Sequence, residues 1–279
     1  MKIKLPAMTS LSKNEILKRN NVSVQGKGSQ PIIFAHGYGC DQSMWRYVYP
    51  EFLEDYKVVL FDHVGAGNAD ESYYSVEKYG SLQGYADDII QICETLELND
   101  TIIVGHSVSS MIAVLAGNTK PEIFSRIIMI GPSPCYINKE DYVGGFDQQD
   151  INELMEALES NYLGWSSTMA PVIMGNPDRP ELGQELTNSF CRTNPEIAKH
   201  FAKVTFLSDN REDLKALKIP SLIIQCSEDV IAPIEVGKYV HNTAVNSSFE
   251  VINANGHCPN LSAPEETIQA IKFYLSKTA

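Results

Sequence analysis

Residues 101–116 read TIIVGHSVSSMIAVLA, and this stretch decides how the rest of the chain is interpreted. Its first four residues are apolar or β-branched, which predicts a buried strand, and its last six have the composition of a buried helix. Ser107 stands between the two. A serine on a sharp strand-to-helix turn has an exposed hydroxyl, and the next backbone N–H points at the group that this hydroxyl approaches. The stretch differs from G-x-S-x-G in one place, because Ser109 replaces the second glycine.

Three further segments each combine an apolar strand with polar or flexible residues at its end. They are residues 32–39 (IIFAHGYG), 222–229 (LIIQCSED) and 249–257 (FEVINANGH). Open α/β sheets bind their ligands at the carboxyl ends of the strands. The chain order of serine, acid and histidine is the order of the α/β-hydrolase fold. We therefore expect these ends to meet at one site.

The residue types at these ends suit nucleophilic catalysis. Serine is a weak nucleophile at neutral pH and needs a base, for which His257 is the candidate. Asp229 would accept the other ring N–H of His257, and Glu228 is the alternative acid. The backbone N–H groups of Tyr38 and Val108 would form the oxyanion hole. This chemistry requires no metal and no organic cofactor.

Other reactive side chains near these motifs have plainer interpretations. His36, His63 and His106 lie in strand-terminal turns, where we expect structural roles. Cys258 adjoins the candidate base, and we expect it to pack rather than to react. A structural turn at Ser107 in a catalytically dead fold remains the alternative to the whole scheme.

Composition excludes several classes of protein. The 279 residues carry a formal net charge of −13, which argues against nucleic acid and anionic membranes as partners. A hydrophobic content of 43% with 20% charged residues is typical of a soluble globular chain. Neither a signal peptide nor a membrane span is apparent, and the six cysteines lack metal-ligand spacing, so we expect a cytoplasmic protein with reduced thiols.

The order of predicted elements indicates an α/β fold, with a mostly parallel sheet covered by helices on both faces. An early edge hairpin is expected near residues 22–25. Residues 138–207 contain no predicted buried strand and only helical stretches. This block predicts an inserted helical lid. The core would then comprise residues 1–137 and 208–279. Apolar lid side chains would wall a pocket for a small apolar substrate, and the candidates are Phe146, Trp165, Met169, Phe190 and Phe206.

Several longer stretches carry a family resemblance that runs from about residue 20 to the C-terminus. They include residues 36–45 (HGYGCDQSMW), 131–136 (GPSPCY), 161–165 (NYLGW) and 208–214 (SDNREDL). The chain resembles the RsbQ-like α/β-hydrolases, bacterial regulators of the sigma-B stress response, and the plant strigolactone and karrikin receptors of the same fold. Tyr38 departs from the pattern, since these proteins usually carry phenylalanine there.

The resemblance implies a four-helix lid over a hydrophobic cavity, with Ser107, Asp229 and His257 as the triad. It also implies that a regulatory phosphatase could be a protein partner. The sequence as a whole predicts a serine hydrolase for a small hydrophobic ester or lactone. A slow-turnover ligand sensor, whose lid surface signals to a partner protein, is the competing hypothesis. A cofactor-free haloperoxidase side reaction would use the same triad, whereas dehalogenase chemistry is disfavoured because it needs a carboxylate in place of Ser107.

Overall fold

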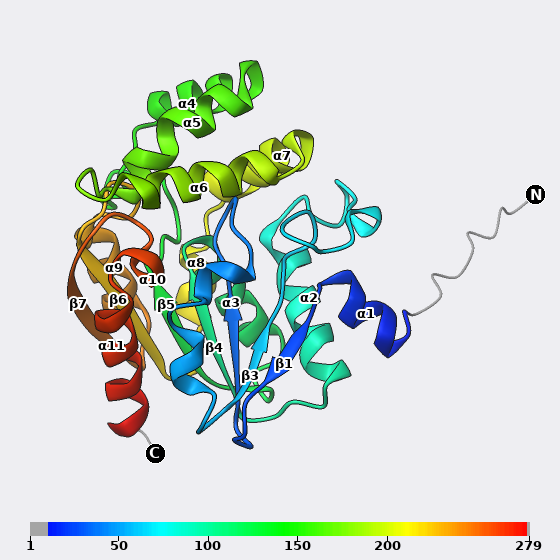
Figure 1. Cartoon of the computed structure of the whole chain (residues 1–279). Coiled ribbons are helices and arrows are strands. Elements are labelled where there is room, and N and C mark those ends of the chain that lie inside the picture. Colours follow the sequence, from blue (N-terminus) through cyan, green and yellow to red (C-terminus); the bar gives the residue numbers. More distant parts are fainter. Residues whose placement is uncertain (1–10, 278–279) are drawn as a thin grey trace, which may run out of the picture.

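A seven-stranded sheet runs through the centre of the molecule in the computed structural model, which describes residues 11–277 (Figure 1). Its strand order is β1-β3-β2-β4-β5-β6-β7. Only β1 is antiparallel to its neighbour, β3, among the described strands. The strands are β1 (Ser23–Gln25), β2 (Pro31–Ala35), β3 (Lys57–Leu60), β4 (Thr101–His106), β5 (Phe124–Ile130), β6 (Ser221–Glu228) and β7 (Ser247–Asn255).

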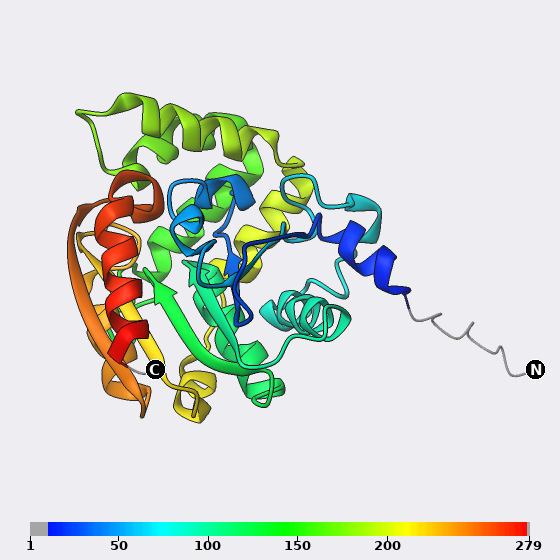
Figure 2. The same ribbon diagram turned by 60° about the horizontal axis from the view of Figure 1, so that its bottom comes forward.

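Helices cover both faces of this sheet, as the sequence predicts (Figure 2). Helix α3 (Val108–Thr119) packs on β4 and β5, with α1 (Lys13–Arg19), α2 (Leu82–Thr95), α8 (Arg211–Ala216) and α9 (Ile234–Thr243) on the same face. The other face carries α11 (Pro264–Lys277) and the short α10 (Pro259–Ser262), together with the 3₁₀ helices η1 (Gln42–Trp45) and η2 (Tyr49–Phe52). A third 3₁₀ helix, η3 (Glu71–Tyr73), precedes α2.

The central strands are apolar on both sides because each face has its own core. Successive side chains of a strand point to opposite faces. Ile33 and Ile103 accordingly join the cluster beneath α2 and α3, whereas Ile32 and Ile102 join the cluster beneath α11. This double burial explains why these strands read as continuous apolar runs, and it confirms the predicted α/β-hydrolase fold class.

Four helices connect β5 to α8, and all lie between residues 138 and 207. They are α4 (Gln148–Ser160), α5 (Tyr162–Met174), α6 (Pro180–Arg192) and α7 (Pro195–Phe206). Proline at the first position of α6 and α7 suits a helix start, where a backbone donor is not needed. The helices gather beyond one end of the sheet, near the carboxyl ends of its parallel strands (Figure 1), and we call them the α4–α7 layer. An isolated antiparallel β-bridge, formed by the backbones of Cys135 and Asp209, joins the chain segments that enter and leave this layer.

Two features differ from the sequence expectations or lie beyond the description. The edge strand near residues 22–25 exists as β1, but the predicted hairpin is wrong, because β1 pairs with β3 and not with the next strand, β2. The predicted core boundaries reach residues 1–10 and 278–279, which lie outside the described residues, as does the segment considered for a signal peptide. Within residues 11–277, none of the helices has the length and apolar character required to cross a bilayer.

Candidate active site

Ser107 sits at the junction of β4 and α3 in a backbone conformation with positive φ (φ 56° and ψ −125°). Its N–H donates to the carbonyl of Ile130 at the end of β5, at 2.8 Å. Gly105 makes the turn possible, because a Cβ atom there would lie 2.4 Å from the carbonyl oxygen of Ser109. A positive φ is unfavourable for a residue with a side chain and persists only where the surroundings enforce it.

A chain of short hydrogen bonds connects Ser107 to two other predicted residues. The Ser107 hydroxyl lies 2.7 Å from Nε2 of His257, and Nδ1 of the same ring lies 2.7 Å from Oδ2 of Asp229. With Nδ1–H donating to the carboxylate, Nε2 is free to accept the serine proton. The loop after β6 carries Asp229 and the loop after β7 carries His257, so three strand ends meet here.

The carboxylate beside His257 is that of Asp229, and the alternative acid Glu228 is placed elsewhere. The Asp229 side chain is 1% exposed, and its Oδ1 accepts the N–H groups of Ile231 and Ala232 at 2.8 and 3.0 Å. Glu228, the last residue of β6, is exposed. Three donors, the two backbone N–H groups and Nδ1–H of His257, therefore satisfy the lone pairs of the buried Asp229 carboxylate.

The two backbone groups considered for an oxyanion hole flank the nucleophile candidate. Tyr38 follows β2, which is the parallel neighbour of β4, and Val108 is the first residue of α3. Neither N–H donates a hydrogen bond within residues 11–277. Both are therefore available to a negatively charged oxygen on the substrate, in addition to the favourable dipole at the N-terminus of α3.

A small cavity of about 40 Å³ lies above Ser107. Three of the predicted pocket residues, Trp165, Phe190 and Phe206, line it. Phe146 and Met169 do not. Both are half-buried against the apolar cluster, outside the cavity lining. The lining residues are Tyr38, Cys40, His106, Ser107, Tyr136, Trp165, Ile173, Leu186, Phe190, Thr205, Phe206, Ile231 and Cys258.

Comparisons with known proteins agree with this geometry. The model of the alpha/beta hydrolase family matches residues 32–270. The chain belongs to this family. It is 40% identical to the "Karrikin insensitive 2 receptor CA" of Petunia hybrida, over 90% of this chain and 94% of the relative. It is 36% identical to the "Strigolactone esterase D14" of Arabidopsis thaliana, over 96% of this chain and 100% of the relative.

A solved structure extends the similarity to the whole fold. The structure of a hydrolase from Oleispira antarctica has a TM-score of 0.93 and 41% sequence identity, covering 96% of this chain and 98% of its own. The predictions of a hydrolase and of a resemblance to the plant receptors are confirmed. The resemblance to the sigma-B regulators stays a prediction.

Two cavity residues of this α/β hydrolase carry hydroxyl groups that the sequence analysis did not select. Tyr136 is buried and lines the same cavity as Ser107, and burial raises the pKa of its phenol to about 12. Thr205 on α7 is 1% exposed, and its hydroxyl has no hydrogen-bond partner within residues 11–277. The position of Tyr136 shortly after β5 was an available signal, because strand ends of the sheet carry the site.

Three other histidines near the site act as structural groups. Nε2–H of His106 donates to the carbonyl of His257 at 2.6 Å, and burial lowers the pKa of His106 to about 3. Nε2 of His36 accepts the N–H of His63 at 3.0 Å. The hydroxyl of Ser109 donates to the His36 carbonyl at 2.5 Å and lies 2.8 Å from Nε2 of His63, whose pKa is lowered well below its usual value, mainly by burial. The Ser109 hydroxyl therefore links His36 to His63 through hydrogen bonds that a glycine at this position could not make.

Cys258 is buried in the cavity wall. This burial raises the pKa of its thiol well above the usual value, so the thiol stays protonated. Among the described residues, no group of three or more His, Cys, Asp or Glu side chains is arranged to hold a metal ion.

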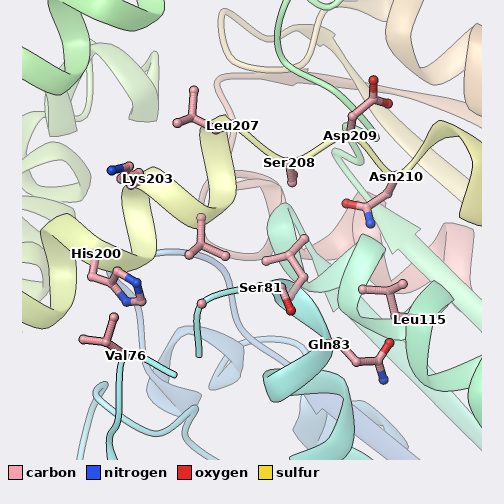
Figure 3. A pocket seen from close by; sticks show the side chains of 13 residues that line it. Val76, Ser81, Gln83, Leu115, His200, Lys203, Leu207, Ser208, Asp209 and Asn210 are labelled. Carbon is pink, nitrogen blue, oxygen red and sulfur yellow. The ribbon is translucent and has the colours of Figure 1, made fainter. Parts of the chain in front are cut away.

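A groove much larger than this cavity lies away from Ser107. It has a volume of about 640 Å³ and runs between the start of α2 and the end of α7; Figure 3 shows His200, Lys203 and Leu207 on one side of it and Ser81 and Gln83 on the other. Ser107, His257 and Asp229 do not line it. Cavity volume therefore does not point to the candidate active site, which is selected instead by the hydrogen-bond chain through Ser107, His257 and Asp229.

The neutral histidines predict acid sensitivity of the folded state. His63 and His106 have folded-state pKa values below the unfolded value of about 6.5, so only the unfolded chain takes up their protons as the pH falls. Their contribution to stability is complete above about pH 6.5 and declines by about 1.4 kcal/mol per pH unit for each group below it.

Urea unfolding at about pH 7 and about pH 5 measures this decline, and NMR of the imidazole nitrogens assigns it. We expect both rings to remain neutral in the folded protein at the lower pH. A free energy of unfolding that stays constant between the two pH values, or rings that titrate near the unfolded value, would contradict the assignment.

Proposed function

We propose that the chain is a serine hydrolase that acts on a small hydrophobic ester or lactone through an acyl-enzyme on Ser107. The observation that carries this proposal is the continuous hydrogen-bond chain from the strained Ser107 through His257 to the buried Asp229. Each residue then has the role that its contacts allow: nucleophile, general acid–base, and orienting carboxylate.

In the acylation step, Oγ of Ser107 forms a bond to the carbonyl carbon while its proton moves to Nε2 of His257. The carbonyl oxygen becomes negatively charged and accepts the N–H groups of Tyr38 and Val108. The C–O bond to the leaving alcohol then breaks, and Nε2–H of His257 returns the proton to the alkoxide. For a lactone the alkoxide stays attached to the acyl group.

Deacylation repeats these steps with water. Nε2 of His257 takes a proton from the water molecule, whose oxygen bonds to the acyl carbon, and the tetrahedral intermediate again places its oxygen at the two N–H groups. Collapse releases the carboxylic acid and returns the proton to Ser107. The carboxylate of Asp229 stabilises the imidazolium in both half-reactions without taking its proton.

The cavity supports a short acyl group as the substrate. A single water needs roughly 10–15 Å³ of such a volume, so about 40 Å³ admits only a few heavy atoms. Ligand sites for larger molecules typically span roughly 300–1,000 Å³. We therefore propose that residues 138–207 form a lid on a core of residues 1–137 and 208–279, and that larger ligands enter only when this lid moves.

Signalling is the second candidate function, and the name of the petunia relative, a receptor, favours it. In this form, slow deacylation would keep the lid in one position, and its outer surface would contact a partner protein such as a sigma-B pathway phosphatase. We place either function in the cytoplasm. The two differ in the rate of deacylation.

Replacing the nucleophile tests the proposal directly. The wild type should release a stoichiometric burst of p-nitrophenol from p-nitrophenyl acetate, because p-nitrophenolate is a good leaving group and acylation is then faster than the attack of water. Ser107→Ala should lose both the burst and the turnover.

Asp229→Asn should lower turnover by about 10⁴-fold because it misorients His257. Glu228→Gln is the matched control, one residue away and exposed, and should react like the wild type.

Stopped-flow absorbance resolves the burst from the later phase. Sustained turnover after the burst identifies a hydrolase, whereas near-complete stalling identifies the sensor form. Turnover that is unchanged in Ser107→Ala would remove the serine from the mechanism.

Acyl-chain length tests the proposed substrate class. The acetyl ester should be preferred over the octanoyl ester by more than about tenfold in kcat/KM, because the longer chain exceeds the closed cavity. Trp165→Leu enlarges the cavity and should reduce that preference. Met169→Ala, one turn further along α5 and outside the lining, should leave it unchanged. Equal kcat/KM for both esters in the wild type would refute the short-acyl assignment.

A further inference from the structure

Two buried hydrogen bonds fasten the loop after β2 to the α4–α7 layer. The loop comprises residues 37–41, and we call it the oxyanion loop. The Tyr38 hydroxyl donates to the carbonyl of Ala198 on α7 at 3.0 Å. The Ser189 hydroxyl on α6 donates to the carbonyl of Gly39 at 2.7 Å. The bonds therefore fix the two successive residues Tyr38 and Gly39 from two different helices.

Direct packing reinforces these bonds. Gly39 has φ 67°, and a Cβ atom on it would lie 2.3 Å from the ring of Phe190 on α6, so the loop backbone rests against that ring. The Tyr38 ring contacts Phe190, Phe201 and Phe206 with centroid distances of 5.7, 5.7 and 6.4 Å. By contrast, the backbone hydrogen bond inside the loop, from Cys40 to Gly37, is long at 3.3 Å.

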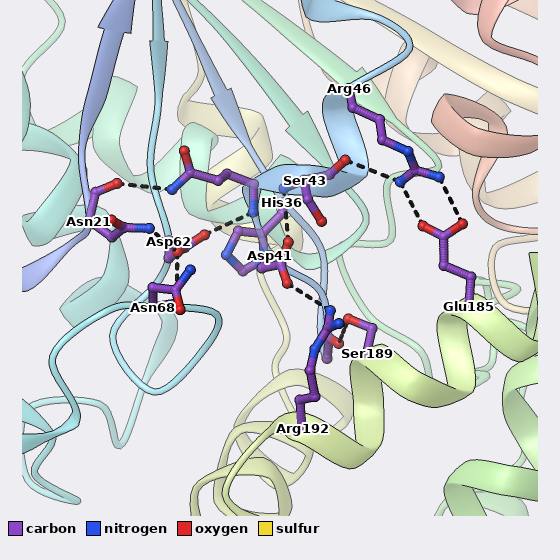
Figure 4. Close-up of polar contacts among 12 residues, drawn as sticks. Asn21, His36, Asp41, Ser43, Arg46, Asp62, Asn68, Glu185, Ser189 and Arg192 are labelled. Atoms are coloured by element: carbon purple, nitrogen blue, oxygen red, sulfur yellow. Dashed lines mark hydrogen bonds and ion pairs between the residues drawn. The ribbon is translucent and has the colours of Figure 1, made fainter.

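Ion pairs from α6 also reach this region of the core (Figure 4). Arg192 lies 3.0 Å from the carboxylate of Asp41 at the end of the loop, but its side chain is 65% exposed. Glu185 and Arg46 form a bidentate pair, with distances of 2.6 and 2.7 Å, that holds α6 to the residue after η1. This second pair attaches the same helix to the core without touching the oxyanion loop.

We infer that Tyr38 and Ser189 are positioning residues that keep the oxyanion hole assembled only while α6 and α7 are seated on the core. The inference rests on the proposed function, in which the N–H of Tyr38 stabilises the oxyanion. The backbone of Tyr38 is held in two ways: its own hydroxyl is bound to the Ala198 carbonyl on α7, and the Ser189 hydroxyl is bound to the carbonyl of the next residue, Gly39. When the helices lift, both bonds break and this N–H loses its fixed direction.

The consequence is that the seating of the helical layer and the chemical step are coupled. An oxyanion-hole donor contributes only when it is fixed in advance at the place where charge develops. A substrate that allows the layer to close is hydrolysed with both donors in place. A ligand that holds the layer away leaves the serine, histidine and aspartate intact but weakens the transition state.

Two conservative variants test the coupling. Tyr38→Phe keeps the ring and removes the hydroxyl, and Ser189→Ala removes the other donor. Loss of a whole oxyanion donor costs about 10²–10³-fold, so a donor that is merely loosened should lower the acylation rate constant by about tenfold. The dissociation constant for p-nitrophenyl acetate, measured in the same burst experiments, should stay within about twofold of the wild type.

Glu185→Gln is the matched control, because it weakens the attachment of α6 while leaving both buried bonds in place. We expect wild-type acylation from it. The inhibition constant of ethylboronic acid is a second measurement, and it would not change if the two hydroxyl groups had a purely structural role. The boronic acid adduct on Ser107 is tetrahedral and places an oxygen at the hole, so the inhibition constant should rise about tenfold in Tyr38→Phe and Ser189→Ala and remain unchanged in Glu185→Gln. Urea unfolding verifies that all three variants are folded.

The failures of the inference and of the proposed function are distinguishable. If the wild type neither acylates nor binds the boronic acid through Ser107, the proposed function fails. If the wild type does both, and the two hydroxyl variants acylate and bind the inhibitor as the wild type does, only the coupling is overturned. An equal loss in Glu185→Gln would also overturn it, because general loosening of α6 would then suffice.

Discussion

The positive φ of Ser107, 56°, is the backbone constraint around which the site is arranged. Such a conformation costs on the order of 1–3 kcal/mol and must be imposed by its surroundings. The parallel pairing of β4 with β5 imposes it on one side and the start of α3 on the other, while Gly105 removes the Cβ that would collide with the turn. Because the serine is fixed, the loops after β6 and β7 need only bring Asp229 and His257 to it.

Burial and hydrogen bonding distinguish the histidines around that serine. His63 and His106 are neutral because the interior disfavours their protonated forms, and their ring N–H groups satisfy neighbouring polar atoms. His257 instead donates Nδ1–H to the carboxylate of Asp229 and directs Nε2 at the Ser107 hydroxyl, which is the geometry that the proposed mechanism requires. Four histidines of similar appearance in the sequence thus have different tasks, and His36 joins two loops as a hydrogen-bond acceptor.

Much of this arrangement could be predicted from the sequence, because it depends on local patterns and chain order. Apolar strands that end in Ser107, Asp229 and His257 predict the sheet and the meeting of their ends. Pairing partners are not local, so β1 was expected in a hairpin and instead pairs with β3. Side-chain direction is not local either. Met169 and Trp165 occupy neighbouring turns of α5, yet only Trp165 lines the cavity, and the bond from Tyr38 to Ala198 spans 160 residues.

Intact-protein mass spectrometry after an acid quench tests the central claim most directly. A sample taken during the burst with p-nitrophenyl acetate should contain protein heavier by one acetyl group, and fragmentation should place that group on Ser107. The adduct should disappear as turnover proceeds and should be absent from Ser107→Ala. Turnover without any acyl adduct on the wild type, or an adduct on another residue such as Cys258, would contradict the account.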